Sequence, residues 1–183
     1  VASALDTPSG KIEIFSEKLL KDTVGWEVAK DDTVSGLDTM APVPAYIPEW
    51  YGVESTTDEY PLALGGFHYR GRTHSSWGGI ELLKEVNPQE AWINPADAKE
   101  RSIKQGDKIR VKNAFGEIEI LAKVTPRVVP GTVCISQGAW HDADRYGDRV
   151  DKVGCSNTLT TQRPSPLAKG NPQHSNICQV TKA

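Results

Sequence analysis

The feature that most constrains the fold is a series of short segments with alternating apolar residues between about residue 60 and residue 135. Residues 109–111 and 118–120 alternate apolar and polar side chains on either side of a turn at 113–116, which predicts a β-hairpin. Further strands are predicted at 60–64 and 132–135. Strands this short and this closely spaced do not fit a doubly wound sheet. The sequence therefore predicts a mainly β protein, a β-barrel with short helices.

Capping signals predict one short helix among these strands. Asn94 is expected to accept a hydrogen bond from the backbone N–H of Asp97, and Pro95 suits a first helical turn, so a helix is expected over Pro95–Lys104. Gly106 suits the end of that helix.

The N-terminal third has a different character. Thr7–Gly10 has turn composition, residues 11–15 alternate like a half-buried strand, and Ser16 is expected to cap a short helix. Residues 31–61 are rich in prolines and turn formers, which predicts an extended connection anchored by aromatic side chains. We therefore expect residues 1–60 to lead into the barrel and pack on it, and residues 61–183 to form the barrel.

Composition excludes several classes of protein. The chain of 183 residues suits one domain with an appendage, and its formal net charge of −3 argues against a generally basic nucleic-acid binder. No apolar run reaches the length of a membrane span, so we expect a soluble chain. Cys134, Cys155 and Cys178 form no CxxC pair, which argues against a disulfide framework, a zinc ribbon or an iron–sulfur site.

Acidic residues are absent from two segments, 61–80 and 152–183. Both carry arginine and histidine, and the second also carries lysine. At the average of the chain, with 24 acidic residues in 183, the two segments together would hold about seven. A carboxylate facing a bound anion would repel it, so the pattern predicts that the two segments jointly face an anion.

The residue types within these segments indicate the kind of anion. Residues 65–79 combine glycines, hydroxyl groups, arginines and aromatic rings, which suit close backbone approach, phosphate binding and stacking. Residues 157–176 offer side-chain amides and hydroxyls that can read the edge of a heterocycle. A phosphate with a heterocycle is a nucleotide-like ligand, although neither GxxxxGK[ST] nor a GxGxxG that follows a strand and opens a helix occurs.

Metal-binding and hydrolase chemistries fit the sequence less well. The four histidines and three cysteines are scattered, which disfavours a zinc site, and Ser75 and Ser76 lack a nucleophile elbow for a Ser-His-Asp hydrolase. The cluster Asp142, Asp144, Asp148 and Asp151 could chelate calcium, but the arginines and lysine between these acids favour a salt-bridged loop.

Motifs spread through nearly the whole chain resemble one known family. In chain order they are Thr7–Glu13, Arg72–Ser76, Trp92–Ala98, Gly106–Asp107, Pro130–Gly131, Asn157–Thr160 and Gly170–Gln173. They are similar to the C-terminal molybdopterin-dinucleotide-binding domain of the dimethyl sulfoxide reductase family of molybdoenzymes, and the tail from Asn157 to His174 is most similar to the catalytic subunits of anaerobic dimethyl sulfoxide reductases.

The resemblance implies a double-psi β-barrel that covers one face of a bis(molybdopterin guanine dinucleotide) cofactor with molybdenum. Thr7–Lys11 would mark the point where the chain enters this domain. By position, the implied cofactor-binding residues are Gly66, Phe67, His68, Arg70, Arg72, Thr73, His74, Ser75, Ser76, Asn157, Thr158, Gln173 and His174.

The resemblance also implies a larger enzyme that reduces S-oxides or N-oxides on the periplasmic face of the bacterial inner membrane. The implied partners are the remaining domains of the catalytic subunit, an iron–sulfur electron-transfer subunit and a membrane-anchor subunit; nucleic acid is not expected. These 183 residues are expected to be inactive and empty of cofactor by themselves. Self-association of the chain through the cofactor face is a further prediction. The alternatives are a stand-alone nucleotide- or partner-binding barrel and a self-processing barrel enzyme related to aspartate decarboxylase.

Overall fold

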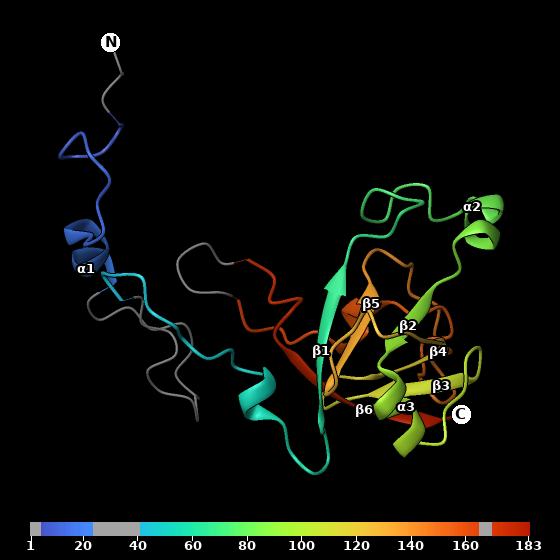
Figure 1. Cartoon of the computed structure of the whole chain (residues 1–183). Coiled ribbons are helices and arrows are strands. Elements are labelled where there is room, and N and C mark those ends of the chain that lie inside the picture. Colours follow the sequence, from blue (N-terminus) through green and yellow to red (C-terminus); the bar gives the residue numbers. More distant parts are fainter. Residues whose placement is uncertain (1–4, 24–40, 165–169) are drawn as a thin grey trace. The chain divides into compact units, whose positions relative to one another are not determined.

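The computed structural model describes residues 5–23, 41–164 and 170–183 (Figure 1). Contacts divide the chain into one compact unit of residues 1–48 and 163–170 and a second of residues 49–162 and 171–183. The strands that the structure describes all belong to the second unit and form a closed barrel. The predicted mainly β barrel with short helices is confirmed, while a division at residue 61 stays a prediction.

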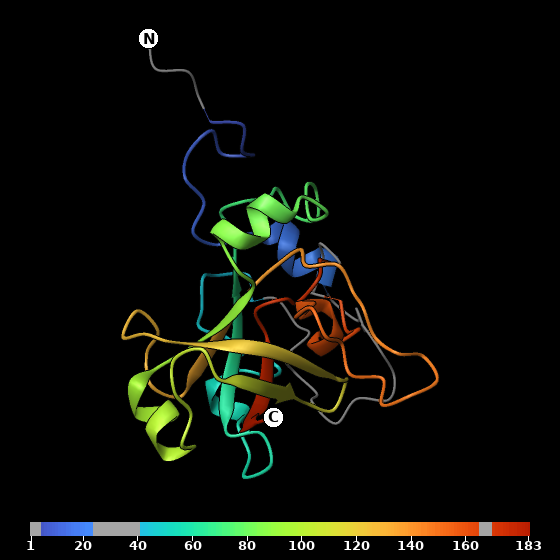
Figure 2. The same cartoon turned by 90° about the vertical axis from the view of Figure 1, so that its right-hand side faces the viewer.

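The barrel has six strands whose order differs from their order in the chain. They are β1 (Leu62–Phe67), β2 (Glu90–Ile93), β3 (Lys108–Lys112), β4 (Glu117–Val124), β5 (Thr132–Ser136) and β6 (Asn176–Lys182). They close in the order β1-β5-β2-β4-β3-β6. The pairs β1–β5 and β2–β4 are parallel and the other four are antiparallel. Figure 2 shows the hairpin of β3 and β4 crossing β1.

The predicted hairpin is confirmed and forms part of the core. Ile109 is opposite Ile120, and Val111 is opposite Ile118 across the β3–β4 pair. All four side chains are at most 5% exposed. Because side chains alternate along a strand, the polar residues between them point outward. The turn is closed by Asn113, whose Oδ1 accepts from the backbone N–H of Phe115 at 2.9 Å.

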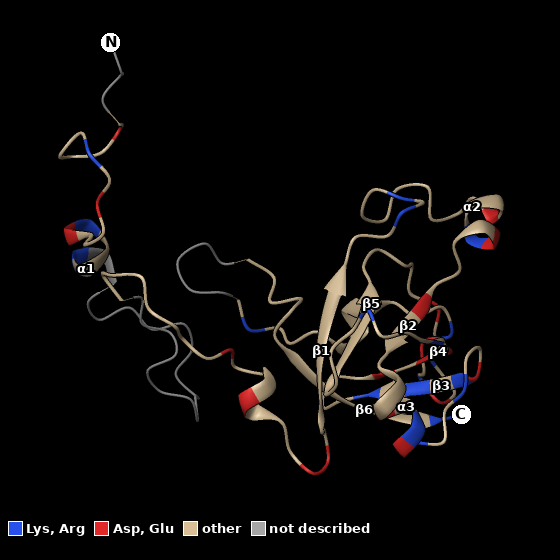
Figure 3. Ribbon diagram, viewed as in Figure 1, with Lys and Arg blue, Asp and Glu red and all other residues tan. Residues whose placement is uncertain are grey.

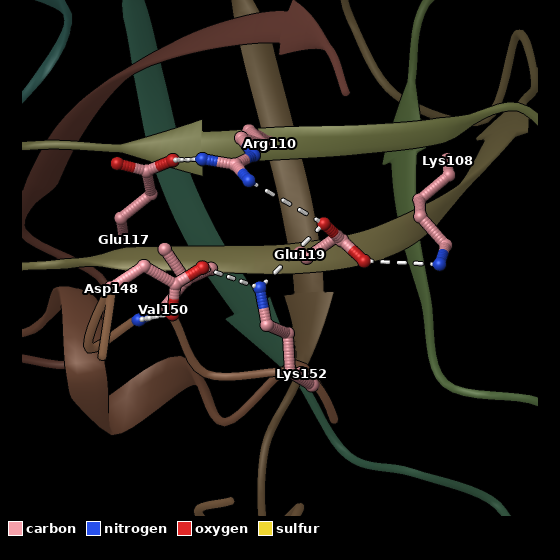
Figure 4. A network of polar contacts seen from close by, with 7 residues as sticks. All are labelled: Lys108, Arg110, Glu117, Glu119, Asp148, Val150 and Lys152. Carbon is pink, nitrogen blue, oxygen red and sulfur yellow. Dashed lines mark hydrogen bonds and ion pairs between the residues drawn. The ribbon is translucent and has the colours of Figure 1, made fainter. Parts of the chain in front are cut away.

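The outward face of the hairpin carries a network of ion pairs (Figure 4). Arg110 lies 2.9 Å from Glu117, and Lys108 lies 3.0 Å from Glu119. Lys152 lies 2.9 Å from Asp148 and 3.9 Å from Glu119. The hydrogen bond from Lys108 is the main cause that lowers the pKa of Glu119. Each cation of this network therefore has a carboxylate that compensates its charge.

The helix predicted at Pro95–Lys104 is shorter, α3 (Pro95–Glu100). Asn94 caps it as expected, but its side chain accepts from the N–H of Ala96 at 2.9 Å and not from Asp97. The helix ends early because Ser102 has a positive φ of 55°, outside the helical region. The other helical segments of the barrel unit are α2 (Glu81–Val86), η1 (Val53–Ser55) and η2 (Ser156–Leu159). Within the described residues, no helix is both long and apolar enough to cross a membrane.

The N-terminal unit contains α1 (Glu17–Thr23), and Ser16 caps it as predicted, since its Oγ accepts from the N–H of Leu19 at 3.1 Å. The strand predicted at residues 11–15 is wrong. Ile12 and Ile14 are 83% and 73% exposed, and the backbone there follows the turn that starts at Thr7. The alternating pattern has no partner strand to pair with. Of the predicted connection at 31–61, residues 31–40 lie outside the described residues, and residues 41–61 are irregular apart from η1.

The aspartates between residues 142 and 151 are structural rather than a uniform salt-bridged set. The expected ion pair is present between Asp148 and Lys152. Asp151 is fully buried, and its carboxylate accepts from the backbone N–H groups of Asp142 at 2.7 Å and Cys155 at 2.6 Å. Backbone bonds also join Asp151 to β4 on both sides. This carboxylate thus fixes the long loop between β5 and η2 against the barrel.

Replacing Asp151 with asparagine should destabilise the barrel. The amide has one acceptor oxygen, so one of the two backbone N–H groups would face an NH2 donor and lose its partner. We expect the free energy of unfolding in urea to fall by about 1–3 kcal/mol. Asp58→Asn, which removes the same charge at the surface, is the control and should change it by less than about 0.5 kcal/mol. Equal effects of the two substitutions would show that Asp151 has no such role.

Candidate functional site

Strand register brings four chain segments to one end of the barrel. Phe67 and Ser136, the last residues of β1 and β5, are opposite each other in the parallel pair. Leu64 is opposite Asn176, the first residue of β6, and Ala91 near the start of β2 is opposite Ile135. The loops after β1 and after β5 and the segments before β2 and before β6 therefore meet at the end to which β1 and β5 point (Figure 1).

Arg72 is held in this end of the barrel by neutral groups. Its Nε and Nη2 donate to the carbonyl oxygen of Gln137 at 3.3 and 3.0 Å, and Nη2 also donates to Oε1 of Gln89 at 2.8 Å. Its guanidinium carbon lies 3.9 Å from the centre of the Tyr69 ring. Burial lowers the pKa of Arg72, although an arginine stays protonated. Among the described residues no carboxylate pairs with it, so its charge is available to a bound anion.

Gln89 connects the segments around Arg72. Its Oε1 accepts from Arg72 and from the Ser136 hydroxyl at 2.5 Å, while its Nε2 donates to the carbonyl oxygens of Ser136 at 2.8 Å and Gly154 at 3.0 Å. The donors and acceptors around it allow only one orientation of the amide. One side chain thus joins the loop after β1, the end of β5 and the segment that leads into η2.

The loop after β1 is fixed at several points. The Gln137 Nε2 lies 2.9 Å from Nδ1 of His68 and 3.2 Å from Nδ1 of His74. The indole N–H of Trp140 donates to the carbonyl oxygen of Ser75 at 2.9 Å. Gly138 has a φ of +87°, and a Cβ there would overlap the carbonyl oxygen of His74. Residue 138 must therefore be glycine for the two loops to approach this closely.

The tail before β6 joins this loop, as the charge pattern predicted. The N–H of Gly66 donates to Nδ1 of His174 at 3.1 Å. A Cβ at Gly66 would lie 2.6 Å from Nε2 of Gln173, so the glutamine amide packs directly over the glycine. Asn176 orders the tail by donating to the carbonyl oxygens of Pro172 and Gln173, both at 3.1 Å. The Nε2 of Gln173 is buried and has no hydrogen-bond partner among the described residues, so it is a donor that a ligand can use.

Asn157 and Thr158 lie in η2, over the β3–β4 turn. Asn113 donates to the carbonyl oxygen of Leu159 at 2.7 Å, and a Cβ at Gly116 would lie 2.6 Å from the carbonyl oxygen of Thr158. The segment that leads into η2 is held beside Gln89, because the Gln89 Nε2 donates to the carbonyl oxygen of Gly154. It returns to the tail through Thr161, whose N–H donates to Asn176 at 3.1 Å. No hydrogen bond recorded between described residues joins Asn157 or Thr158 to the Arg72 loop.

The predicted site residues thus fall into three groups. Those of the β1 end and its loop lie together, and those of the tail join them through Gly66. Among the described residues, no hydrogen bond joins those of η2 to either group. Within the loop, His68, Arg70 and Thr73–Ser76 are exposed. The residues that organise the site were not predicted, because none of them forms a sequence motif with its neighbours. They are Gln89, Ser136, Gln137, Gly138 and Trp140.

A groove of about 800 Å³ opens beside Arg72, with Tyr69, Gln89 and Trp140 among the residues that line it. The loop between β1 and α2 carries Arg70 and Arg72 but no acidic residue, as the colouring of basic and acidic residues shows (Figure 3). Within residues 5–23, 41–164 and 170–183, no three His, Cys, Asp or Glu side chains form a metal-binding group. Burial raises the pKa of Cys178 to about 12, so its thiol is not poised as a nucleophile. Glu119 and Asp142 also line the groove, so the features suited to binding an anion are those of the loop around Arg72.

The fold and the site together define a closed β-barrel whose loops at one end carry arginine, histidine and side-chain amide groups. Residues 62–177 match the family described as "Molydopterin dinucleotide binding domain", and the chain belongs to that family. The resemblance to the dimethyl sulfoxide reductase family is confirmed.

Several relatives align with almost all of this chain. It is 52% identical over 181 residues to dimethyl sulfoxide reductase DmsA of Haemophilus influenzae and 51% identical over 185 residues to DmsA of Escherichia coli. A trimethylamine-N-oxide reductase of Haemophilus influenzae is 37% identical over 185 residues. These alignments cover 97–99% of this chain but only 21–22% of each relative, so the chain spans about a fifth of their length.

Among solved structures, acetylene hydratase from Pelobacter acetylenicus superposes with a TM-score of 0.70 over 97% of this chain and 24% of that chain. The sequence identity is 19%, so this similarity supports the fold alone.

The close approach at Gly138 can be tested with a matched pair of glycine substitutions. Gly138→Ala places a methyl group on the His74 carbonyl, whereas Gly131→Ala meets no atom within 4 Å at a similar φ of +80°. Both substitutions place an alanine at a positive φ, which strains the backbone. Only Gly138→Ala also brings a methyl group into the His74 carbonyl oxygen. We expect Gly138→Ala to lower the free energy of unfolding by about 1–3 kcal/mol more than Gly131→Ala and to shift the amide NMR signals of residues 72–76. Equal losses with unmoved loop signals would contradict the contact.

Proposed function

We propose that this chain is the cofactor-binding barrel of a molybdenum oxidoreductase, and that it binds molybdopterin guanine dinucleotide through the end of the barrel at Arg72. The observation that carries the proposal is the joining of the two acid-free segments at Gly66, inside the part of the chain that matches the family. The chemistry of the site fits this ligand, since it offers an uncompensated cation, an unpartnered buried amide donor and close backbone approach.

Each group of residues has a distinct role in the proposal. Arg72 would compensate the charge of the pyrophosphate, with Gln89 and Gln137 fixing the direction of its guanidinium. Gln173 would donate from its buried amide to the pterin or the guanine. The other residues predicted from the resemblance complete the proposed contact surface; they are Gly66, Phe67, His68, Arg70, Thr73, His74, Ser75, Ser76, Asn157, Thr158 and His174. When bound, the cofactor supplies oxygen-atom transfer and two-electron chemistry, while these residues bind and orient it.

The wider setting is also part of the proposal. The relatives are named dimethyl sulfoxide and trimethylamine-N-oxide reductases, so the parent enzyme would reduce such S-oxides or N-oxides with a bis(molybdopterin guanine dinucleotide) molybdenum centre. It would act in anaerobic electron transport at the periplasmic face of the inner membrane. The remaining catalytic domains, an iron–sulfur subunit and a membrane-anchor subunit would be its partners. The two parallel strand pairs of the barrel agree with a double-psi topology.

Direct binding can be measured by NMR on the 183-residue chain. Titration with molybdopterin guanine dinucleotide should shift the amide signals of residues 66–76 and 171–174 and the side-chain amide signal of Gln173. Guanosine diphosphate serves as a smaller probe and should act on a subset of them. Saturable shifts confined to other parts of the barrel would contradict the site. Binding of any nucleotide with the same affinity would favour the stand-alone nucleotide-binding module instead.

The role of Arg72 can be tested in a chimera, in which this chain replaces the aligned fifth of Escherichia coli DmsA. Arg72→Ala removes a charge-assisted hydrogen bond worth about 1.5–3 kcal/mol and should lower the bound molybdenum and guanine per chain together with dimethyl sulfoxide reduction. Arg110→Ala, which removes a compensated surface cation, is the control and should leave cofactor content unchanged. Full cofactor content in the Arg72→Ala chimera would be incompatible with the proposed role.

A further inference from the structure

A second, smaller cavity shares Tyr69 with the groove at Arg72. Its volume is about 280 Å³, and Tyr69 and Pro88 line both spaces. Arg72 lines only the groove, whereas Arg70 lines only the small cavity. The two arginines are two residues apart, yet they face different spaces. The basic loop after β1 therefore serves two cavities.

Three cations from different parts of the barrel line the small cavity. Arg70 comes from the loop after β1, Lys123 from β4 and Arg127 from the turn that follows β4. The only carboxylate in its lining is Glu90, which lies 3.1 Å from Lys123. Among the described residues no carboxylate pairs with Arg70 or Arg127. The cavity thus keeps an excess of positive charge.

The ion-paired network on the outer face of β3 and β4 shows how cations are accommodated elsewhere in this barrel. Lys108, Arg110 and Lys152 each lie within 3.0 Å of a carboxylate oxygen (Figure 4). Two uncompensated arginines around a cavity differ from that arrangement and indicate an external anion.

Trp92 determines which kind of anion the cavity can take. Lys123 lies 5.2 Å and Arg127 6.0 Å from the centre of its ring, and Phe67 packs against it with ring centres 4.7 Å apart. The ring is therefore already occupied by cations and by an aromatic neighbour, so it is poorly placed to stack on a heterocycle. The indole instead holds the two cations beside the cavity. A compact, highly charged group fits this lining better than a flat ring.

We propose that the cavity lined by Arg70, Lys123 and Arg127 is a phosphate-binding subsite, separate from the groove at Arg72, for a phosphate or diphosphate group. Arg70 would form a bidentate contact, Lys123 and Arg127 would supply charge, and the Asn87 amide can donate from the rim. The inference goes beyond the proposed function, because Lys123 and Arg127 are not among the proposed cofactor residues. The group could belong to a bound dinucleotide or to free phosphate.

The first experiment is titration of the 183-residue chain with inorganic pyrophosphate, followed by NMR through the indole N–H signal of Trp92 and the amide signals of Lys123 and Arg127. We expect saturable shifts of these three signals that weaken with added salt. Arg127→Gln and Arg70→Gln should each weaken binding about tenfold. Arg110→Gln is the matched control and should not change it. Absence of saturable shifts, or affinity in the Arg70→Gln and Arg127→Gln variants that equals that of the unsubstituted chain, would overturn the proposal.

Arg127 lies against Trp92, so Arg127→Gln can weaken binding by disturbing the fold. Arg70 is exposed and has no ring contact among the described residues, so Arg70→Gln tests the charge alone. If only Arg127→Gln weakens binding and it also lowers the free energy of unfolding, the subsite assignment fails.

The Arg72→Ala variant separates this proposal from the proposed function. Unchanged pyrophosphate affinity in that variant supports an independent subsite, even if the dinucleotide does not bind at the groove. Loss of pyrophosphate binding in Arg72→Ala alone places the anion in the groove and overturns the subsite. Displacement of pyrophosphate by molybdopterin guanine dinucleotide identifies the dinucleotide as the source of the group, and simultaneous binding identifies free phosphate; either result requires the subsite.

Discussion

The parallel register of β1 and β5 is the constraint on which the rest of this structure depends. It sets the last residues of two distant strands side by side, so that the loops after them must leave the barrel at the same end. β6 then runs antiparallel to β1 and brings the tail to that end. Segments separated by more than a hundred residues in the chain thus become neighbours at Gly66. The order and direction of the strands therefore place these segments at one end of the barrel, whatever side chains they carry.

Neutral side-chain amides hold together the loops and the tail that the topology brings to one end of the barrel. Gln89, Gln137 and Asn176 hold the loops and tail with hydrogen bonds that add no charge. Had carboxylates served the same purpose, they would have cancelled the arginines that face the two cavities. The outer face of the hairpin shows the other solution, in which acids and bases compensate one another (Figure 4). Amides therefore hold Arg72 without adding charge, whereas carboxylates compensate the cations of the hairpin.

The barrel and its hairpin were predictable because alternation of apolar residues is a local pattern, and the core pairs such as Ile109 with Ile120 follow from it. The same pattern failed at residues 11–15, where Ile12 and Ile14 remain exposed, since a strand also needs a partner that sequence does not reveal. The helix after Asn94 was predicted too long because the positive φ of Ser102 depends on its surroundings.

The charge pattern of the two acid-free segments indicated where to look for the site, and Gly66 with His174 shows the two segments in contact. Residues that act through one long-range hydrogen bond, such as Gln89 and Gln137, were not predictable. Their partners lie 17 to 65 positions away, and a single glutamine has no distinguishing neighbours. The grouping of Lys123 and Arg127 with Arg70 likewise depends on the crossing of strands rather than on spacing.

The closure of the barrel by β6 also determines the order of events during synthesis. β6 pairs with β1 and with β3, so residues 176–182 must emerge from the ribosome before either edge is covered. Until then the edges of β1 and β3 present unpaired backbone groups, and Gly66 has neither Gln173 nor His174 beside it. Pairings between residues so far apart in sequence form slowly. The half-made barrel is therefore the state in which this chain is most exposed to misassociation.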